Sequence, residues 1–366
     1  MILYGLLLAA VGASLLLGLG LSAAAIRLAP RFGYVDHPGG HKSHGAVVPY
    51  GGGIAIFLAS WVPLAILLLV ANLLDPAWIA DTFGEQARAY AVGLNKRAFA
   101  ALIIMAGGGA LHLLGLFDDV RPLSAGLKLA VIAAIGLAVP LVAEVRIAEF
   151  AGPIGATLLT AAWIIVITNT FNFLDNMDGL SAGVACICMG FLIVCGLAAG
   201  QVFVPATGCV FLGAMGGFLA FNFPPARLFM GDAGSLLVGY MLAVLSILTT
   251  YYESASGAPP YALAMPLVVL AIPLYDFVSV VVIRLREGRN PMKGDQRHFS
   301  HRLVERGLSR RLAVLTIYLA TAVTGLCATL LPGADLRRTV TIGVIVIMVL
   351  AIVAILEMPL RKDRNP

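Results

Sequence analysis

The sequence predicts an all-α, multi-pass membrane protein, and two features of its composition support this prediction. Of the 366 residues, 60% are hydrophobic and only 12% are charged, whereas charged residues make up about a quarter of a typical soluble domain. The hydrophobic residues gather in runs of about 20, the length that a helix needs to cross the hydrocarbon core of a bilayer. We therefore exclude a soluble globular fold, expect no nucleic-acid partner, and treat residues 1–366 as one integral-membrane domain.

Eleven such runs are present, and each predicts one transmembrane helix. The first run starts at Ile2, has no basic segment before it and is longer than the core of a signal peptide, so we expect it to be a retained span. The predicted helices lie near residues 2–26, 51–74, 98–117, 126–143, 154–171, 179–200, 201–221, 233–252, 261–283, 312–331 and 339–359.

Three of these helices contain a formal charge. Lys128 and Glu357 lie near helix ends, from which long side chains can reach the membrane surface. Asp276 lies deeper in its span, where an ionisable residue favours a position inside the bundle or beside a site. A hydrogen-bonded structural carboxylate explains Asp276 equally well. The five cysteines also lie in apolar runs, show no metal-ligand spacing and are expected to be small core residues.

The basic residues are distributed unequally between the two sides of the bilayer when the loops alternate. Eighteen of the 24 Lys and Arg residues fall on one side, which the positive-inside rule assigns to the cytoplasm. The N-terminus is then outside and the C-terminus is cytoplasmic. The same alternation places every loop with candidate Asp or His residues on the cytoplasmic face, where we expect the active site.

Polar residues gather at the end of the fifth predicted helix. The uncharged run that includes Ile164 ends in Asn169, Asn172, Asp175 and Asp178. Two amides and two carboxylates at a membrane surface could hold a hard cation such as Mg²⁺ through their oxygen atoms. An ordinary solvated loop is the alternative, and this stretch alone does not choose between them.

A second pair of carboxylates, Asp118 and Asp119, ends the third predicted helix. Adjacent like charges repel, which raises the pKa of one of the two groups and suits a general base. The alternative is a pair of surface aspartates neutralised by Arg121.

Two further loops contain candidate ligands for an anion or a metal. The loop after the first helix is rich in Gly and Pro, which leaves backbone N–H groups free for phosphate, and it contains Lys42 and His44. The segment that begins at Asn222 leads to Asp232 at the start of the next helix, where Asp232 could be an N-cap or a metal ligand. An ordinary loop and a plain helix cap remain the alternatives.

The last large loop contains His298, His301 and Arg302. The histidines are three residues apart, so a short helix would present all three side chains toward one patch. Such a patch could bind a nucleotide pyrophosphate through charge-assisted hydrogen bonds. A basic segment attracted to anionic lipid would explain the arginine but not the two histidines.

Taken in order, these motifs resemble those of the polyprenyl-phosphate N-acetylhexosamine-1-phosphate transferases, which form glycosyltransferase family 4. The branch that uses undecaprenyl phosphate and UDP-N-acetylglucosamine is the most similar. The resemblance extends from about Asp36 to Ser309. The motifs that carry it are Lys42…His44, Asp118-Asp119, Asn169…Asn172…Asp175…Asp178-Gly179-Leu180, Asn222…Gly231-Asp232…Ser235 and His298…His301-Arg302.

The resemblance implies an enzyme of the bacterial cytoplasmic membrane that transfers N-acetylhexosamine 1-phosphate from a UDP-sugar to polyprenyl phosphate in a cell-envelope polysaccharide pathway. It implies that Mg²⁺, or Mn²⁺ in its place, is held by Asn172 and Asp232, and that Asp118 or Asp119 activates the lipid phosphate. The residues implied in substrate binding are Lys42, His44, Asp175, Asp178, Asn222, His298, His301 and Arg302. A homodimer, and the choice between direct attack and a covalent aspartyl intermediate, stay open.

Two departures from the family pattern bear on the substrate. The family commonly has Gly where this chain has Asn176, which changes the turn geometry. The histidine motif often reads His-x-His-His, and Ser300 replaces its middle histidine. This argues against the branch that uses the muramyl-pentapeptide nucleotide, which remains the alternative enzyme. The alternative of another class is a proton-coupled transporter, although only Asp276 lies well inside a span and no internal repeat is evident.

Overall fold

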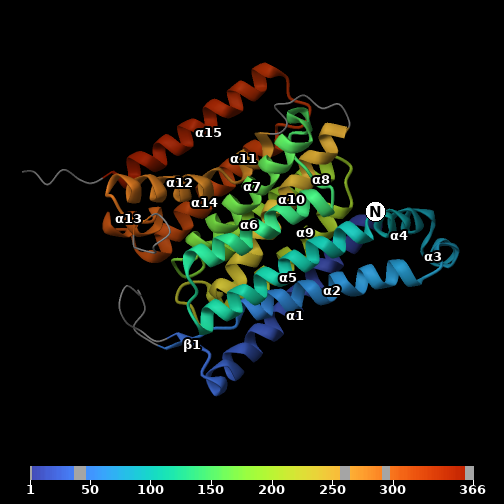
Figure 1. The fold of residues 1–366 in the computed structure, drawn as a ribbon, viewed down its shortest axis with the longest axis horizontal. Coiled ribbons are helices and arrows are strands. Elements are labelled where there is room, and N and C mark those ends of the chain that lie inside the picture. The colour runs from blue at the N-terminus through green and yellow to red at the C-terminus, as the bar shows by residue number, and fades with distance from the viewer. Residues whose placement is uncertain (1, 37–46, 256–263, 291–296, 359–366) are drawn as a thin grey trace, which may run out of the picture.

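The computed structural model describes residues 2–36, 47–255, 264–290 and 297–358, and it is almost entirely helical (Figure 1). Lys42 and His44 lie outside the described residues. Within the described ranges, ten helices are long and apolar enough to cross a membrane, which confirms an all-α multi-pass fold. They are α1 (Ile2–Leu28), α2 (Gly52–Leu73), α5 (Ala98–Val120), α6 (Ala125–Val142), α7 (Gly152–Leu174), α8 (Leu180–Ala198), α9 (Phe203–Asn222), α10 (Gly231–Ala255), α14 (Arg310–Thr329) and α15 (Leu336–Glu357).

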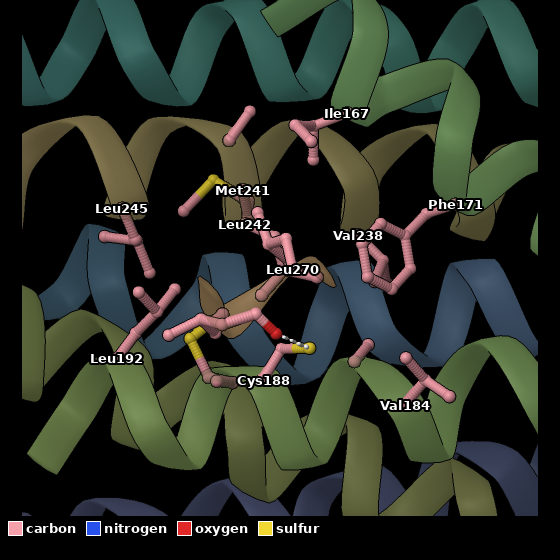
Figure 2. Close-up of a cluster of buried hydrophobic side chains, with 14 of the residues drawn as sticks. Ile167, Phe171, Val184, Cys188, Leu192, Val238, Met241, Leu242, Leu245 and Leu270 are labelled. Carbon is pink, nitrogen blue, oxygen red and sulfur yellow. Dashed lines mark hydrogen bonds between the residues drawn. The ribbon is translucent and has the colours of Figure 1, made fainter. Parts of the chain in front are cut away.

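The ninth predicted span is interrupted. In place of one helix near 261–283, the chain forms two consecutive helices, α11 (Met265–Val269) and α12 (Ala271–Arg286). Pro273 has no N–H, so the carbonyl of Val269, four residues earlier, lacks its helical partner. The thiol of Cys188 donates to this carbonyl at an Sγ–O distance of 3.4 Å (Figure 2). A thiol of a neighbouring helix thus pairs with the carbonyl that the break leaves open, and two consecutive helices occupy the ninth predicted span in place of one.

Two short helices lie between the second and third predicted spans, where no helix was predicted. α3 (Pro76–Phe83) and α4 (Glu85–Lys96) follow α2 and project from one end of the bundle (Figure 1). Asp75 begins α3, because its Oδ1 accepts a hydrogen bond from the N–H of Ala77 at 2.9 Å. Both helices are too short to cross a bilayer, so a search for apolar runs of about 20 residues does not find them.

α10 lies at the centre of the bundle, and every residue from 233 to 250 is buried. Glycines let its neighbours approach closely. A Cβ at Gly115 of α5 would lie 2.3 Å from the backbone nitrogen of Ala233, and one at Gly239 would lie 2.9 Å from the carbonyl oxygen of Ile167 in α7. Figure 2 shows the buried cluster that α10 forms with α7, α8 and α11. The start of α10 is therefore fixed against the end of α5.

The polar segments lie together at one end of the bundle. A two-stranded antiparallel hairpin, β1 (Val35–Asp36) and β2 (Val48–Pro49), lies at this end with α13 (Phe299–Glu305). The start of α1 and the pair α3–α4 lie at the opposite end (Figure 1). Of the loops singled out in the sequence, those that the structure describes therefore share one end of the bundle, while Lys42 and His44 lie outside the described residues.

Candidate active site

Asp119, in the last turn of α5, caps the start of α10. Its Oδ1 accepts the backbone N–H of Asp232 at 2.7 Å, and its Oδ2 accepts that of Ala233 at 3.3 Å. The hydroxyl of Tyr34 donates to Oδ2 at 2.8 Å. A carboxylate at a helix N-terminus satisfies unpaired N–H groups and interacts favourably with the positive end of the helix dipole. Asp119 is therefore an internal ligand of α10 and not a surface aspartate.

Gly231 permits this close approach. Its φ is +70°, in the left-handed region that favours glycine, and a Cβ at this position would lie 2.4 Å from Oδ2 of Asp119. Asp232 itself lies in the first turn of α10 and donates its N–H to the cap. The interpretation of Asp232 as the N-cap is therefore wrong, because Asp119 takes that role. The side-chain carboxylate of Asp232 does not cap the helix and pairs with Lys128 instead.

Lys128, in the first turn of α6, joins two carboxylates. Its Nζ lies 3.0 Å from Oδ2 of Asp118 and 2.9 Å from Oδ2 of Asp232. The other oxygen of Asp118 accepts the N–H of Leu123 at 2.7 Å. The side chains of Lys128, Asp118 and Asp232 are 23%, 13% and 26% exposed, so a ligand can reach all three.

The prediction that Lys128 reaches for the membrane surface from a helix end is wrong. Its ammonium group instead lies between two carboxylates from α5 and α10. A signal was present in the sequence, because a lysine at the start of an apolar run stands ten residues after Asp118. That spacing crosses a turn between two helices, so the contact depends on how α5 and α6 pack together.

The end of α7 brings Asn172 and Asp175 to the same place. The Nδ2 of Asn172 donates to Oγ of Ser235, in the first turns of α10, at 2.9 Å. Asp175 follows the last residue of α7 and is half-buried. Burial, followed by repulsion from Asp232 and then from Asp119, raises the pKa of Asp175 to about 8. The carboxylates of α5, α7 and α10 thus share one region of negative potential.

Asp178 and Asn222 brace the loops around this region. Asn222, buried at the end of α9, accepts the N–H of Gly179 and donates to the carbonyl of Leu228, each at 2.9 Å. Asp178 accepts the N–H of Ala226 at 2.9 Å. These bonds tie the α7–α8 turn to the segment that leads into α10. Direct contact of either residue with a substrate stays a prediction.

Asn176 and Ser300, the two departures from the family pattern, contact each other. The hydroxyl of Ser300 donates to Oδ1 of Asn176 at 2.6 Å, and Nδ2 of Asn176 donates to the carbonyl of Phe173 at 2.9 Å. Among the residues that the structure describes, Glu144 and Ala148 are the non-glycine residues with positive φ. Asn176 therefore contributes a side-chain link between the α7–α8 turn and α13, not a left-handed backbone conformation.

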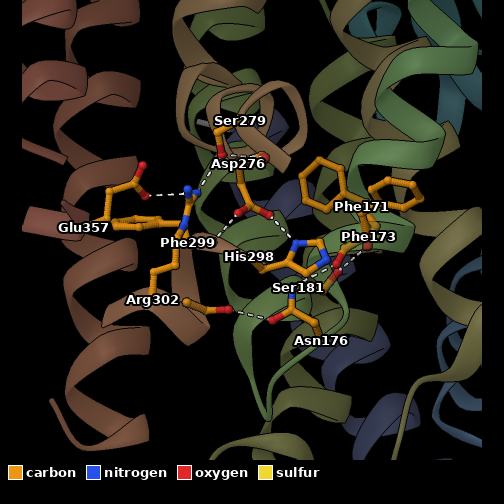
Figure 3. Close-up of polar contacts among 11 residues, drawn as sticks. Phe171, Phe173, Asn176, Ser181, Asp276, Ser279, His298, Phe299, Arg302 and Glu357 are labelled. Carbon is orange, nitrogen blue, oxygen red and sulfur yellow. Dashed lines mark hydrogen bonds and ion pairs between the residues drawn. The ribbon is translucent and has the colours of Figure 1, made fainter. Parts of the chain in front are cut away.

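His298 lies at the N-cap of α13 and is held by Asp276 of α12 (Figure 3). Its Nδ1 lies 2.9 Å from Oδ2 of Asp276, and the N–H of Phe299 donates to Oδ1 at 2.7 Å. An ionised carboxylate only accepts hydrogen bonds, so Nδ1 carries the hydrogen and Nε2 is the imidazole nitrogen that remains for a ligand. Asp276 is thus both a hydrogen-bonded structural carboxylate and the residue that orients a candidate site histidine.

The remaining basic residues of α13 have different partners. The short helix is confirmed, and His301 is half-buried, with its pKa lowered by burial and then by the charge of His298. Arg302 turns toward α15, where its Nη2 lies 2.7 Å from Oγ of Ser279 and 3.0 Å from Oε2 of Glu357. The three basic side chains therefore do not form one patch. Glu357, expected to reach the membrane surface, is also corrected, because its side chain is 10% exposed and paired with Arg302.

Known proteins with similar sequences support a transferase site. The description of the matching family is glycosyl transferase family 4, and the match covers residues 101–250, from α5 to α10. The chain is 31% identical over 338 residues to the probable undecaprenyl-phosphate N-acetylglucosaminyl 1-phosphate transferase of Bacillus subtilis (strain 168), which covers 90% of this chain and 86% of the relative.

Two further relatives agree. The decaprenyl-phosphate N-acetylglucosaminephosphotransferase of Mycolicibacterium smegmatis is 32% identical over 323 residues, which cover 80% of this chain and 74% of the relative. The undecaprenyl-phosphate alpha-N-acetylglucosaminyl 1-phosphate transferase of Escherichia coli (strain K12) is 26% identical over 312 residues, with coverage of 81% and 76%. The chain therefore belongs to glycosyl transferase family 4, as the order of its motifs indicated.

Proposed function

We propose that this protein transfers N-acetylglucosamine 1-phosphate from UDP-N-acetylglucosamine to polyprenyl phosphate. The observation that supports it most directly is the cluster of Asp118, Asp119, Asp232 and Lys128 at the start of α10, in a chain similar to three proteins named for such a transfer. An oxygen of the lipid phosphate attacks the β-phosphorus of the UDP-sugar. The bond from that phosphorus to the bridging oxygen breaks, which gives polyprenyl-diphospho-N-acetylglucosamine and UMP.

The residues of this cluster fit a divalent cation such as Mg²⁺ or Mn²⁺. Asp175 lies near Asp232 and Asp119, whose negative charges add to the effect of burial in raising its pKa. No group of three His, Cys, Asp or Glu side chains among the described residues is arranged to hold a metal without help. This is compatible with Mg²⁺, which often binds one or two carboxylates together with substrate phosphates. Asp232 and Asn172 would hold the cation, which would neutralise charge on the pyrophosphate.

Lys128 is placed to bind the phosphates that react. Phosphoryl transfer depends mainly on positioning and charge neutralisation, and a lysine ammonium binds phosphate as a point charge. An entering pyrophosphate competes with Asp118 and Asp232 for this ammonium group. His298 and His301 would contact the donor diphosphate from the α13 segment. His298 would do so through Nε2, which donates to a phosphate oxygen when both ring nitrogens carry a hydrogen.

The hydrogen bonds favour a different division of roles among the carboxylates from the one the sequence suggested. Asp119 is held by the start of α10 and Asp118 by Lys128, so we assign both to positioning. Asp175, with a pKa of about 8, is better matched to proton exchange near neutral pH. The lipid phosphate needs little assistance, because the second pKa of a phosphate ester is about 6.

The test is UMP release by purified protein with polyprenyl phosphate, Mg²⁺ and a panel of nucleotide sugars. We expect release with UDP-N-acetylglucosamine, and none when the lipid phosphate is omitted. Release only with the muramyl-pentapeptide nucleotide would move the protein to the alternative branch. If none of the nucleotide sugars in the panel supports UMP release, the proposal is overturned.

In this proposal the end of the bundle that holds α13 and the candidate active site faces the cytoplasm, and the N-terminus lies outside. The excess of basic residues at the active-site end supports this orientation. The test places single cysteines at exposed Asp81 and exposed Arg121, at opposite ends of the bundle, after replacement of the five native cysteines. A maleimide that cannot cross membranes should label position 81 in intact cells and position 121 only after lysis. The reverse pattern would invert the orientation.

A further inference from the structure

A second polar cluster lies outside the start of α10 and connects α15 with α12 and α13 (Figure 3). Glu357, in the last turn of α15, accepts a hydrogen bond from the hydroxyl of Tyr275 at 2.6 Å. Its other oxygen pairs with Nη2 of Arg302 at 3.0 Å, and the same Nη2 donates to Oγ of Ser279 at 2.7 Å. The side chains of Arg302 and Glu357 are only 15% and 10% exposed, so the pair is largely shielded from solvent.

Because of the surroundings of Glu357, its ion pair with Arg302 holds the end of α15 in position. The rest of α15 after its first turn is apolar, and much of its surface is exposed for contact with lipid. Apolar contacts give little preference for one helix neighbour over lipid, since lipid tails are as apolar as leucine. A carboxylate among such residues is unfavourable unless it is paired and hydrogen-bonded. Glu357 therefore fixes the end of α15 against α12 and α13.

The same short stretch of α12 holds both this cluster and the candidate site histidine. Tyr275 donates to Glu357, while the next residue, Asp276, holds His298 and the start of α13. Ser279, one turn later, contacts Arg302. α13 is thus attached to α12 at two points, at its N-cap and through Arg302. Two points of attachment determine how the helix is rotated, and so where His298 and His301 point.

We propose that Glu357 is a positioning residue of the transferase, which acts through Arg302 to fix the rotation of α13 and the donor-binding histidines on it. This inference rests on the proposed function. Without the carboxylate, the guanidinium of Arg302 would stay charged and keep Ser279, a neutral group, as its partner in this cluster. A poorly paired charge in a shielded position seeks water or another anion. Arg302 would then move and rotate α13.

The variant Glu357→Gln tests this, because it keeps the size of the side chain and removes its charge. We expect the KM for UDP-N-acetylglucosamine and the Kd for UDP to rise about tenfold, as for the loss of one charge-assisted hydrogen bond. The kcat at saturating donor and the KM for polyprenyl phosphate should stay within about twofold. Glu149→Gln is the matched control, since Glu149 is exposed and precedes α7, far along the chain from the cluster.

A double variant, Glu357→Gln with Arg302→Met, separates positioning from direct binding. In both variants the attachment of α13 through Arg302 and Glu357 is lost, so two changes that act through one contact should not add. We expect the Kd for UDP of the double variant to lie within about twofold of that of Glu357→Gln. A double variant that binds UDP much more weakly than Glu357→Gln would overturn the proposal, because Arg302 would then bind the donor itself.

The remaining outcomes distinguish the two proposals. If the wild type turns over the donor and Glu357→Gln has wild-type donor affinity, the role of Glu357 fails and the proposed function stands. If Glu357→Gln lowers kcat by the same factor as it weakens donor binding, and also lowers the melting temperature, Glu357 has only a structural role. That result would overturn the inference. If the wild type neither binds UDP nor releases UMP, both proposals fail.

Discussion

Oδ2 of Asp276 lies 2.9 Å from Nδ1 of His298, although the two residues are 22 positions apart and belong to different helices. Both are buried. The contact determines which imidazole nitrogen carries the hydrogen, and a histidine oriented in this way can present its second nitrogen to a ligand.

Asp276→Asn should weaken donor binding. An amide in place of the carboxylate removes the negative charge that favours a ring with a hydrogen on both nitrogens, the form that donates to Asp276 and to a phosphate oxygen together. We expect a KM for the UDP-sugar raised about tenfold, and a changed pH profile of kcat/KM, with the KM for lipid phosphate unchanged. Steady-state kinetics between pH 6 and 9 measure both. Asp81→Asn, at an exposed position of α3, is the control. Wild-type kinetics in Asp276→Asn would leave Asp276 with a packing role only.

Lys128→Met should remove most of the turnover. The ammonium lies between Asp118 and Asp232, and loss of one preorganised cationic group at a site of charge development lowers kcat by about 10²-fold. Single-turnover rates at several Mg²⁺ concentrations are the measurement. We expect no recovery at high Mg²⁺, because Lys128 is proposed to bind phosphate. Lys96→Met, on the exposed surface of α4, should behave as the wild type. Full recovery with excess Mg²⁺ would mean that Lys128 only neutralises the carboxylates.

Asn176 and Ser300 should be energetically coupled. Their hydrogen bond of 2.6 Å joins the α7–α8 turn to α13. Ser300→Ala and Asn176→Ala should each destabilise the protein by about 1 kcal/mol, and the double variant should lose little more than either single variant. Thermal unfolding in detergent and the KM for the UDP-sugar would show the coupling. Strictly additive effects would show that the two residues act independently.

Asp175 should make the metal-free protein less stable as the pH rises. The folded protein keeps the proton on Asp175 up to about pH 8, whereas the unfolded chain loses it near the usual value for Asp of about 4. Folding therefore binds a proton in this window, and the free energy of unfolding falls as the pH rises through it. Asp175→Asn removes this dependence.

The measurement is the melting temperature of wild type and Asp175→Asn, without metal, at pH 5 and pH 8. From pH 5 to pH 8, we expect the melting temperature of the wild type to fall relative to that of Asp175→Asn. Added Mg²⁺ should reduce this difference in melting temperature at pH 8, because it stabilises the ionised carboxylate. Asp81→Asn should follow the wild type at both values. A constant difference between wild type and Asp175→Asn would place the pKa of Asp175 outside this window.

The sequence predicted the helices well, because each apolar run of about 20 residues has one low-energy arrangement in a bilayer. It also found the candidate residues, since polar groups at the ends of such runs are conspicuous. It did not find their partners. Asp119 and the N–H of Asp232 are 113 residues apart, and nothing local distinguishes a carboxylate that caps another helix from one that acts on a substrate.

The two errors over Lys128 and Glu357 have the same origin. A charged residue near the end of an apolar run can reach water or turn inward, and the local sequence is the same in both cases. The partners decide the outcome: Lys128 meets carboxylates from α5 and α10, and Glu357 meets Arg302 and Tyr275. A search for opposite charges at the same end of different predicted helices would have suggested both pairs.

The break between α11 and α12 leaves one joint of the chain with a weaker hydrogen bond than a continuous helix would have. The carbonyl of Val269 is held by the thiol of Cys188, and a thiol is a weaker donor than the backbone N–H that Pro273 lacks. α12 carries Asp276 at the polar end, while α11 packs against α14 on the other side of the break. The position of the histidine segment relative to the core around α10 therefore depends on one weak hydrogen bond at this joint as well as on the packing of α12.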